Sequence, residues 1–272
     1  MQDMKEKRKR WLSLGVAIAS GVSIGATAAE LPAGRGMHHA VMTLAMAAQG
    51  EGGEGEGGSA AVSLETDDQA YLTRLGLIRG HLRVGYELYR AGHSDMAITH
   101  MKHPRDELYA GLVPAMQARG AATFDAELSA LAERVIADAG QAEVNEAYTA
   151  LQGAIVEAEA VTNASLRLTM LSVMDLVRTA GEEYALGVEE GRLVNRHEYQ
   201  DAYGFTEVAK QRLQDMPAET RAQSPETVEQ VLQLLGELST LWPGIAPGDT
   251  VDGEASRLYG VAARIEIAAL GL

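Results

Sequence analysis

The sequence of 272 residues contains no cysteine. This absence excludes a disulfide scaffold, cysteine-ligated zinc, iron–sulfur clusters, haem attached through a C-x-x-C-H motif and catalysis by a thiol. A metal ion bound by this chain would therefore need histidine, methionine, carboxylate or backbone ligands.

Aromatic residues and positive charge are also scarce. Aromatics make up 5% of the chain, so Leu, Val, Ala, Ile and Met must build most of the core. This composition suits helices better than a β-sandwich, which needs β-branched and aromatic residues. The formal net charge of −15 argues against nucleic acid as a partner, because phosphate binding needs a concentrated basic surface.

The N-terminus has the ordered features of an export signal. The basic stretch KEKRKR precedes the apolar stretch WLSLGVAIASGVSIGATAA, which ends in small residues. We expect a signal peptide at residues 1–29, cleaved on export to the periplasm. An uncleaved membrane anchor is the alternative, because the apolar stretch is almost long enough to span a bilayer. No later segment has that length and apolarity, which predicts no stable membrane insertion after cleavage.

Two different parts follow the signal. Residues 30–65 include the tract EGGEGEGGSAA and predict a disordered Gly/Glu-rich linker. Over residues 66–272 apolar residues recur at helical steps, as at Leu72, Leu75 and Ile78, and convincing alternating strand patterns are missing. The prediction is an all-α domain, an antiparallel helical bundle of about seven or eight helices. It divides naturally into two packed helical subdomains joined near residues 140–165, and Pro104 is expected to end one helix and start the next.

The stretch ITHMKHPRDELY, residues 98–109, concentrates candidate metal ligands. His100 and His103 are three residues apart and Met96 precedes His100 by four, so the three share one helix face. The preceding helix, folded back by a short turn, brings further donors toward that face, and acids begin the next helix. The candidate ligands are His81, Glu87, Met96, His100, His103, Asp106 and Glu107.

These donor types allow several metals. Imidazole with carboxylate suits iron, zinc or manganese, and imidazole with a thioether suits copper. A purely structural corner is the alternative, because a histidine near a helix C-terminus is stabilised by the helix dipole. The spacing alone leaves both interpretations open.

Motifs of known enzyme classes are missing. The sequence holds no G-x-S-x-G elbow, H-E-x-x-H helix, Walker loop or strand-borne G-x-G-x-x-G. His197 and Glu198 form an adjacent pair, and helical spacing predicts that they point away from each other. The sequence therefore favours a protein that is not an enzyme.

The segment YALGVEEGRLVNRHEYQDAYGF, residues 184–205, resembles a segment of the extracytoplasmic helical domain associated with bacterial high-affinity, oxidase-linked iron permeases. The matching positions are Tyr184, Val188, Gly191, Val194, Glu198, Tyr199 and Phe205. The permeases' membrane-embedded Arg-Glu-x-x-Glu motif and their membrane spans are missing here. The resemblance implies a role beside a metal uptake system, with a membrane permease or another uptake component as partner.

Three functional interpretations follow. In the first, an exported helical protein binds or delivers a transition metal, with iron favoured over copper, zinc or manganese, as an accessory to a metal uptake system. In the second, a non-catalytic interaction module docks on a membrane complex and its histidine corner is structural. In the third, the chain is an enzyme of unrecognised type that uses a metal at the same corner.

Overall fold

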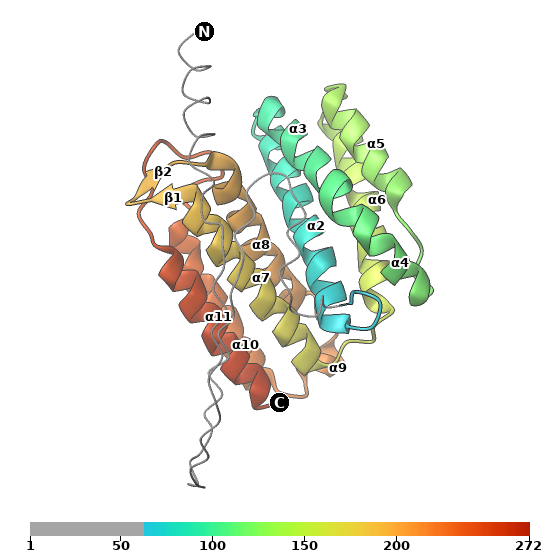
Figure 1. Ribbon diagram of the computed structural model, residues 1–272, viewed down its shortest axis with the longest axis vertical. Coiled ribbons are helices and arrows are strands. Elements are labelled where there is room, and N and C mark those ends of the chain that lie inside the picture. Colours follow the sequence, from blue (N-terminus) through green and yellow to red (C-terminus); the bar gives the residue numbers. More distant parts are fainter. Residues whose placement is uncertain (1–62) are drawn as a thin grey trace, which may run out of the picture. The chain divides into compact units, whose positions relative to one another are not determined.

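The computed structural model describes residues 63–272. The predicted signal peptide and residues 30–62 of the predicted linker lie outside the described residues. Within them the all-α prediction is confirmed, because helices form most of residues 63–272 (Figure 1). The strands of the described part are two-residue β1 (Val188–Glu189) and β2 (Arg192–Leu193), paired antiparallel as a small hairpin.

The first group of helices packs around one apolar core. It comprises α2 (Asp68–Arg90), α3 (Ser94–His103), a π-helical turn (Pro104–Tyr109), α4 (Ala110–Ala118), α5 (Asp125–Ile136) and α6 (Gln141–Ala160). The Asp67 side chain caps α2 by accepting a hydrogen bond from the Ala70 amide. Gly92, at φ +82°, makes the turn that folds α3 back along α2.

The second group of helices packs around another apolar core. It comprises α7 (Leu166–Gly187), α8 (Arg196–Gln214), α9 (Ala218–Arg221), α10 (Pro225–Glu237), a 3₁₀ turn (Leu238–Leu241) and α11 (Ala255–Leu270). Asn195 caps α8 through its side chain, which accepts from the His197 amide. Figure 1 shows α2 between α3–α6 and the helices α7 and α8 of this second group.

Two glycines set how closely α2 and α8 approach. A Cβ atom added at Gly204 would lie 2.5 Å from the carbonyl oxygen of Gly80, and one added at Gly80 would overlap the Phe205 ring. A larger residue at either position would push the helices apart. This close approach places His81, beside Gly80, against the face of α8 that carries Asp201.

The structure continues the helix through Pro104, where the sequence predicted a helix end. The turn from Pro104 to Tyr109 is π-helical and joins α3 directly to α4. A π turn widens the helix, which accommodates a proline ring and its missing N–H group. Among the described residues no helix is long and apolar enough to cross a membrane.

Candidate metal centre

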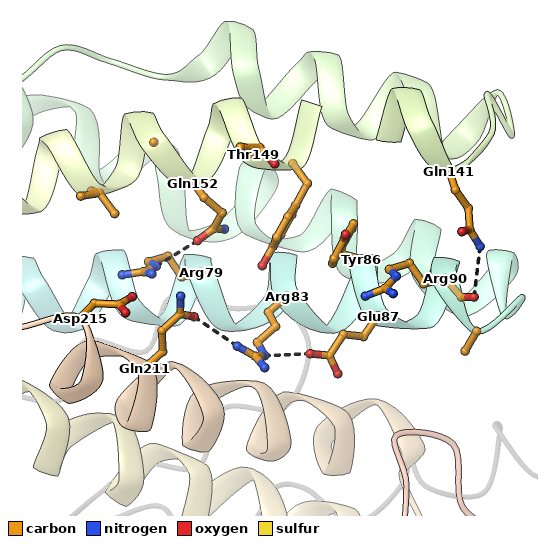
Figure 2. Close-up of a pocket in the computed structure, with 14 residues that line it drawn as sticks. Arg79, Arg83, Tyr86, Glu87, Arg90, Gln141, Thr149, Gln152, Gln211 and Asp215 are labelled. Atoms are coloured by element: carbon orange, nitrogen blue, oxygen red, sulfur yellow. Dashed lines mark hydrogen bonds and ion pairs between the residues drawn. The ribbon is translucent and has the colours of Figure 1, made fainter. Parts of the chain in front are cut away.

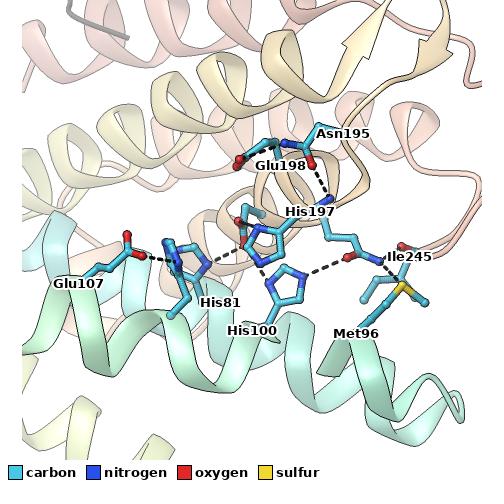
Figure 3. Close-up of polar contacts among 11 residues, drawn as sticks. His81, Met96, His100, Glu107, Asn195, His197, Glu198 and Ile245 are labelled. Carbon is cyan, nitrogen blue, oxygen red and sulfur yellow. Dashed lines mark hydrogen bonds and ion pairs between the residues drawn. The ribbon is translucent and has the colours of Figure 1, made fainter. Parts of the chain in front are cut away.

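Asp201 of α8 is the centre of a cluster of histidines from three helices. Its side chain is 2% exposed. Oδ1 lies 2.6 Å from Nδ1 of His81 on α2 and 3.1 Å from Nδ1 of His100 on α3. Oδ2 lies 3.1 Å from Nδ1 of His197, one turn earlier on α8. Figure 3 shows the rings of His81, His100 and His197 close together, each on a different helix.

The orientation of His100 is fixed by Gln200. The Gln200 amide nitrogen donates to the Ile245 carbonyl oxygen (3.0 Å), so the Gln200 Oε1 atom faces His100 Nε2, also at 3.0 Å (Figure 3). An amide oxygen can only accept, so His100 Nε2 carries the proton of this hydrogen bond. Its other nitrogen, Nδ1, therefore either binds a second proton or presents a lone pair to Asp201.

That nitrogen lacks a hydrogen-bond partner. His100 is fully buried, and its Nδ1 makes no hydrogen bond of acceptable geometry although Asp201 Oδ1 is 3.1 Å away. A lone pair facing a carboxylate oxygen at this distance is repulsive unless a cation lies between them. A proton or a metal ion can fill that role.

The carboxylate of Asp201 is held in its ionised form. Burial alone would raise its pKa, but the charge of His81 and the imidazoles that surround the carboxylate hold the pKa well below its usual range. An ionised carboxylate can only accept hydrogen bonds, so the 2.6 Å contact is donated by His81 Nδ1.

Two further histidines form the more exposed edge of the cluster. The His197 ring stacks on His100 with centroids 4.1 Å apart, and the His103 ring lies 4.7 Å from that of His81. Burial works against the charged form of His197, but the Asp201 carboxylate raises its pKa overall. Burial and the neighbouring charge of His81 lower the pKa of His103. The side chains of His197 and His103 are 27% and 31% exposed.

Acidic side chains extend the cluster toward α7. Glu198, next to His197, lies near Glu183 of α7. Burial raises the pKa of Glu183 to about 9, helped by a hydrogen bond with Glu198 and by the negative charges of Glu198, Asp201 and Glu182.

The structure separates the candidate ligands proposed from the sequence. His81 and His100 meet at Asp201, whereas His103 Nδ1 lies 3.1 Å from Glu107 Oε1. Glu87 accepts a hydrogen bond from the Tyr203 hydroxyl (2.8 Å) and pairs with Arg83, and the Met96 sulfur lies 3.6 Å from the Gln200 amide nitrogen. Asp106 belongs to the π-helical turn, and its side chain lies outside the described part of the structure.

Asp201 and His197 were not among the candidate ligands predicted from the sequence. They are four residues apart on a predicted helix, which places their side chains on one face and was an available signal. His197 and Glu198 were expected to point apart. Instead they and Asp201 each offer one ligand atom within 4.8 Å of the others.

The donor set of the buried part fits a transition metal. His81, His100 and Asp201 each offer one ligand atom, and the three atoms lie within 4.8 Å of one another. Two imidazoles and one carboxylate, with positions left open, are the set typical of non-haem Fe(II), and zinc and manganese accept the same donors. A histidine that binds a metal commonly donates the N–H of its other ring nitrogen to a neighbouring group, as His100 does to Gln200.

A second polar region lies in the groove between α2, α6 and α8 (Figure 2). Arg83 of this groove pairs with Glu87 (2.9 Å) and donates to Gln211 (3.2 Å), and Arg79 donates to Gln152 (3.2 Å). Arginine has no lone pair to offer a metal. Glu87 and Asp215 also line the groove, but no histidine does, so the groove lacks the donor set found around Asp201.

Residues 157–268 match the model of the iron permease-associated 4-helix bundle domain. The match contains α7, α8, α10 and nearly all of α11, and it confirms the resemblance inferred at residues 184–205. His197, Glu198 and Asp201 fall inside it, whereas His81 and His100 lie outside. No curated protein and no solved structure matches the chain.

Proposed function

We propose that this chain, which carries an iron permease-associated 4-helix bundle domain, binds a transition metal between His81, His100 and Asp201. Iron is the favoured metal, and the protein presents it as an accessory to a metal uptake system. The observation that supports this best is the buried Nδ1 atom of His100, which Gln200 orients toward the ionised Asp201 and which lacks a hydrogen-bond partner.

The choice of iron rests on the ligands and on the family. Two imidazoles with one carboxylate suit Fe(II) and leave coordination positions open for exchange. An imidazole–thioether pair would favour copper. The Met96 sulfur contacts the Gln200 amide nitrogen, so copper has less support than iron. The description of the matching family, an iron permease-associated domain, points in the same direction.

The arrangement suits capture and handover better than catalysis. The inner ligands are buried, and the partly exposed rings of His103 and His197 lie next to them on the side toward solvent. A metal ion could therefore pass between solvent and the buried site by exchange among imidazoles. Export to the periplasm, predicted from residues 1–29, would place the protein beside a membrane permease.

Binding of Fe²⁺ under anaerobic conditions tests the proposal. A ligand that binds only the folded state stabilises it by mass action, by about 2.7 kcal/mol at a hundred times its Kd. Wild type should bind Fe²⁺ in calorimetry and melt at a higher temperature with it. The His81→Ala/His100→Ala double variant should bind less Fe²⁺ than wild type and should melt with a smaller Fe²⁺-dependent increase in temperature. His93→Ala, which removes an exposed histidine at the start of α3, should respond as wild type does.

Circular dichroism shows whether the double variant is folded. If it is not, Asp201→Asn replaces it, because the two side chains have nearly the same shape and the amide is a far weaker metal ligand. Equal Fe²⁺ responses of wild type and a folded variant would contradict the proposal. The histidine cluster would then be structural, and an interaction module docking on a membrane complex would be the better interpretation.

A further inference from the structure

The two oxygens of Asp201 face different sets of ligands. Oδ1 contacts His81 and His100, whereas Oδ2 contacts Nδ1 of His197 at 3.1 Å. Glu198 joins the second set, because its carboxylate, that of Asp201 and the His197 ring each place one ligand atom within 4.8 Å of the others. A carboxylate with ligands gathered at both oxygens has the arrangement of a bridge between two cations.

The second set also contains an unsatisfied nitrogen. His197 Nε2 is buried and makes no hydrogen bond, although the side chain as a whole is 27% exposed. Its ring is held by stacking on His100, with an interplanar angle of 4°. His197 therefore links the two sets physically, and each set holds one imidazole nitrogen without a partner.

We propose that Asp201 bridges two metal positions, an inner one with His81 and His100 and an outer one with His197 and Glu198. This inference rests on the proposed function and deepens it. The outer position takes a divalent transition cation with carboxylate and imidazole ligands, of the same class as the inner one. Because His197 is partly exposed, the outer position is the one that exchanges metal with solvent or with a partner.

Charge supports a pair of positions. Two divalent cations around a single carboxylate would leave a large excess of positive charge in a buried site, which is costly. Glu198 supplies a second carboxylate at the outer position. The outer position thus has two carboxylates, Glu198 and Asp201, and the inner position has the shared carboxylate of Asp201.

The number of Fe²⁺ ions bound per chain tests the inference. Equilibrium dialysis of the whole protein under anaerobic conditions, followed by elemental analysis, should find two ions for wild type. Glu198→Gln keeps the size of the side chain and the contact with Asn195 (3.3 Å), and should bind one ion. His81→Ala/His100→Ala should also bind one ion, and Asp201→Asn should bind none. The control Glu189→Gln, at an exposed acid of β1, should bind two.

The outcomes separate the two proposals. One ion in wild type that persists in Glu198→Gln overturns the outer position and leaves the proposed function intact. One ion that is lost in Glu198→Gln and retained in His81→Ala/His100→Ala overturns the inner site and the bridge together. An Asp201→Asn variant that still binds one ion shows that the carboxylate does not bridge. No bound ion in wild type contradicts the proposed function itself.

Discussion

Two buried carboxylates connect helices of the two halves of this protein, and they do so with different partners. Glu159 of α6 receives Arg79 Nη1 at 2.9 Å and Arg212 Nη2 at 2.6 Å, and its side chain is 15% exposed. Asp201 receives imidazoles from α2, α3 and its own helix. In both cases one partner comes from α2, from residues only two apart in sequence.

The difference lies in what the partners can do besides carry charge. Arginine is always protonated and has only donors, and Arg212 uses them on Glu159, the Ser172 hydroxyl (3.0 Å) and the Leu72 carbonyl (2.9 Å). The imidazole nitrogens around Asp201 can lose a proton and then bind a metal. A carboxylate whose arginine partners have all their donors in use is therefore a structural tie, whereas one with incompletely paired histidines is a candidate binding site.

The largest expected effect is the difference between the two carboxylates in how much each contributes to the unfolding free energy. Glu159→Gln leaves two buried arginine charges uncompensated and should cost about 3–5 kcal/mol of unfolding free energy. Asp201→Asn should cost less in the metal-free protein, about 1–3 kcal/mol, because imidazoles can release their protons. Urea denaturation at neutral pH measures both losses.

The control for this measurement is Glu157→Gln, an exposed acid on the same helix as Glu159. It should change the unfolding free energy by less than about 0.5 kcal/mol. A larger loss of unfolding free energy for Asp201→Asn than for Glu159→Gln would contradict this prediction, because it would make the histidine cluster the stronger structural tie.

The next largest expected effect is the dependence of the unfolding free energy on pH in acid solution. Burial alone would raise the pKa of Glu159, but Arg212 and Arg79 lower it below its ordinary value. The pKa of a glutamate in the unfolded chain is about 4.3. A carboxyl whose pKa is lower in the folded state contributes stability that is present above the unfolded pKa and is lost as pH falls through the folded pKa. The difference in stability between wild type and Glu159→Gln should therefore shrink as pH is lowered from about 5 toward 2.

Denaturant melts of the two proteins across this range measure that difference. Glu157→Gln should follow the wild-type curve. A difference that stays constant down to the lowest pH at which both proteins fold would show that the arginines do not depress the pKa of Glu159.

The sequence predicted the helices but only part of the site, for a physical reason. Helices follow from local spacing, and the spacing of His100 and His103 was enough to place them on one face. Asp201 is 120 residues from His81, and their contact depends on the packing of α2 against α8 at Gly80 and Gly204. No local pattern specifies that packing.

Local rules also failed at Pro104. A proline normally predicts a helix start, and the sequence was divided there accordingly. The π-helical turn carries the helix past Pro104 and so keeps Glu107 one turn from His103. The partner of each histidine is thus decided by helix packing and by a rare local geometry.

The smallest expected effect is a change in Fe²⁺ affinity, and it distinguishes two glutamines, one beside each carboxylate. Gln200 accepts from His100 Nε2 and so fixes which nitrogen faces Asp201, whereas Gln152 accepts from Arg79. If the histidine cluster is the metal site, Gln200→Leu should weaken Fe²⁺ binding about 10-fold, because ligands lose affinity when their outer hydrogen bond is removed. Gln152→Leu should leave the Kd unchanged. Anaerobic calorimetry on the two variants measures the ratio, and equal Kd values for both would show that Gln200 does not position a metal ligand.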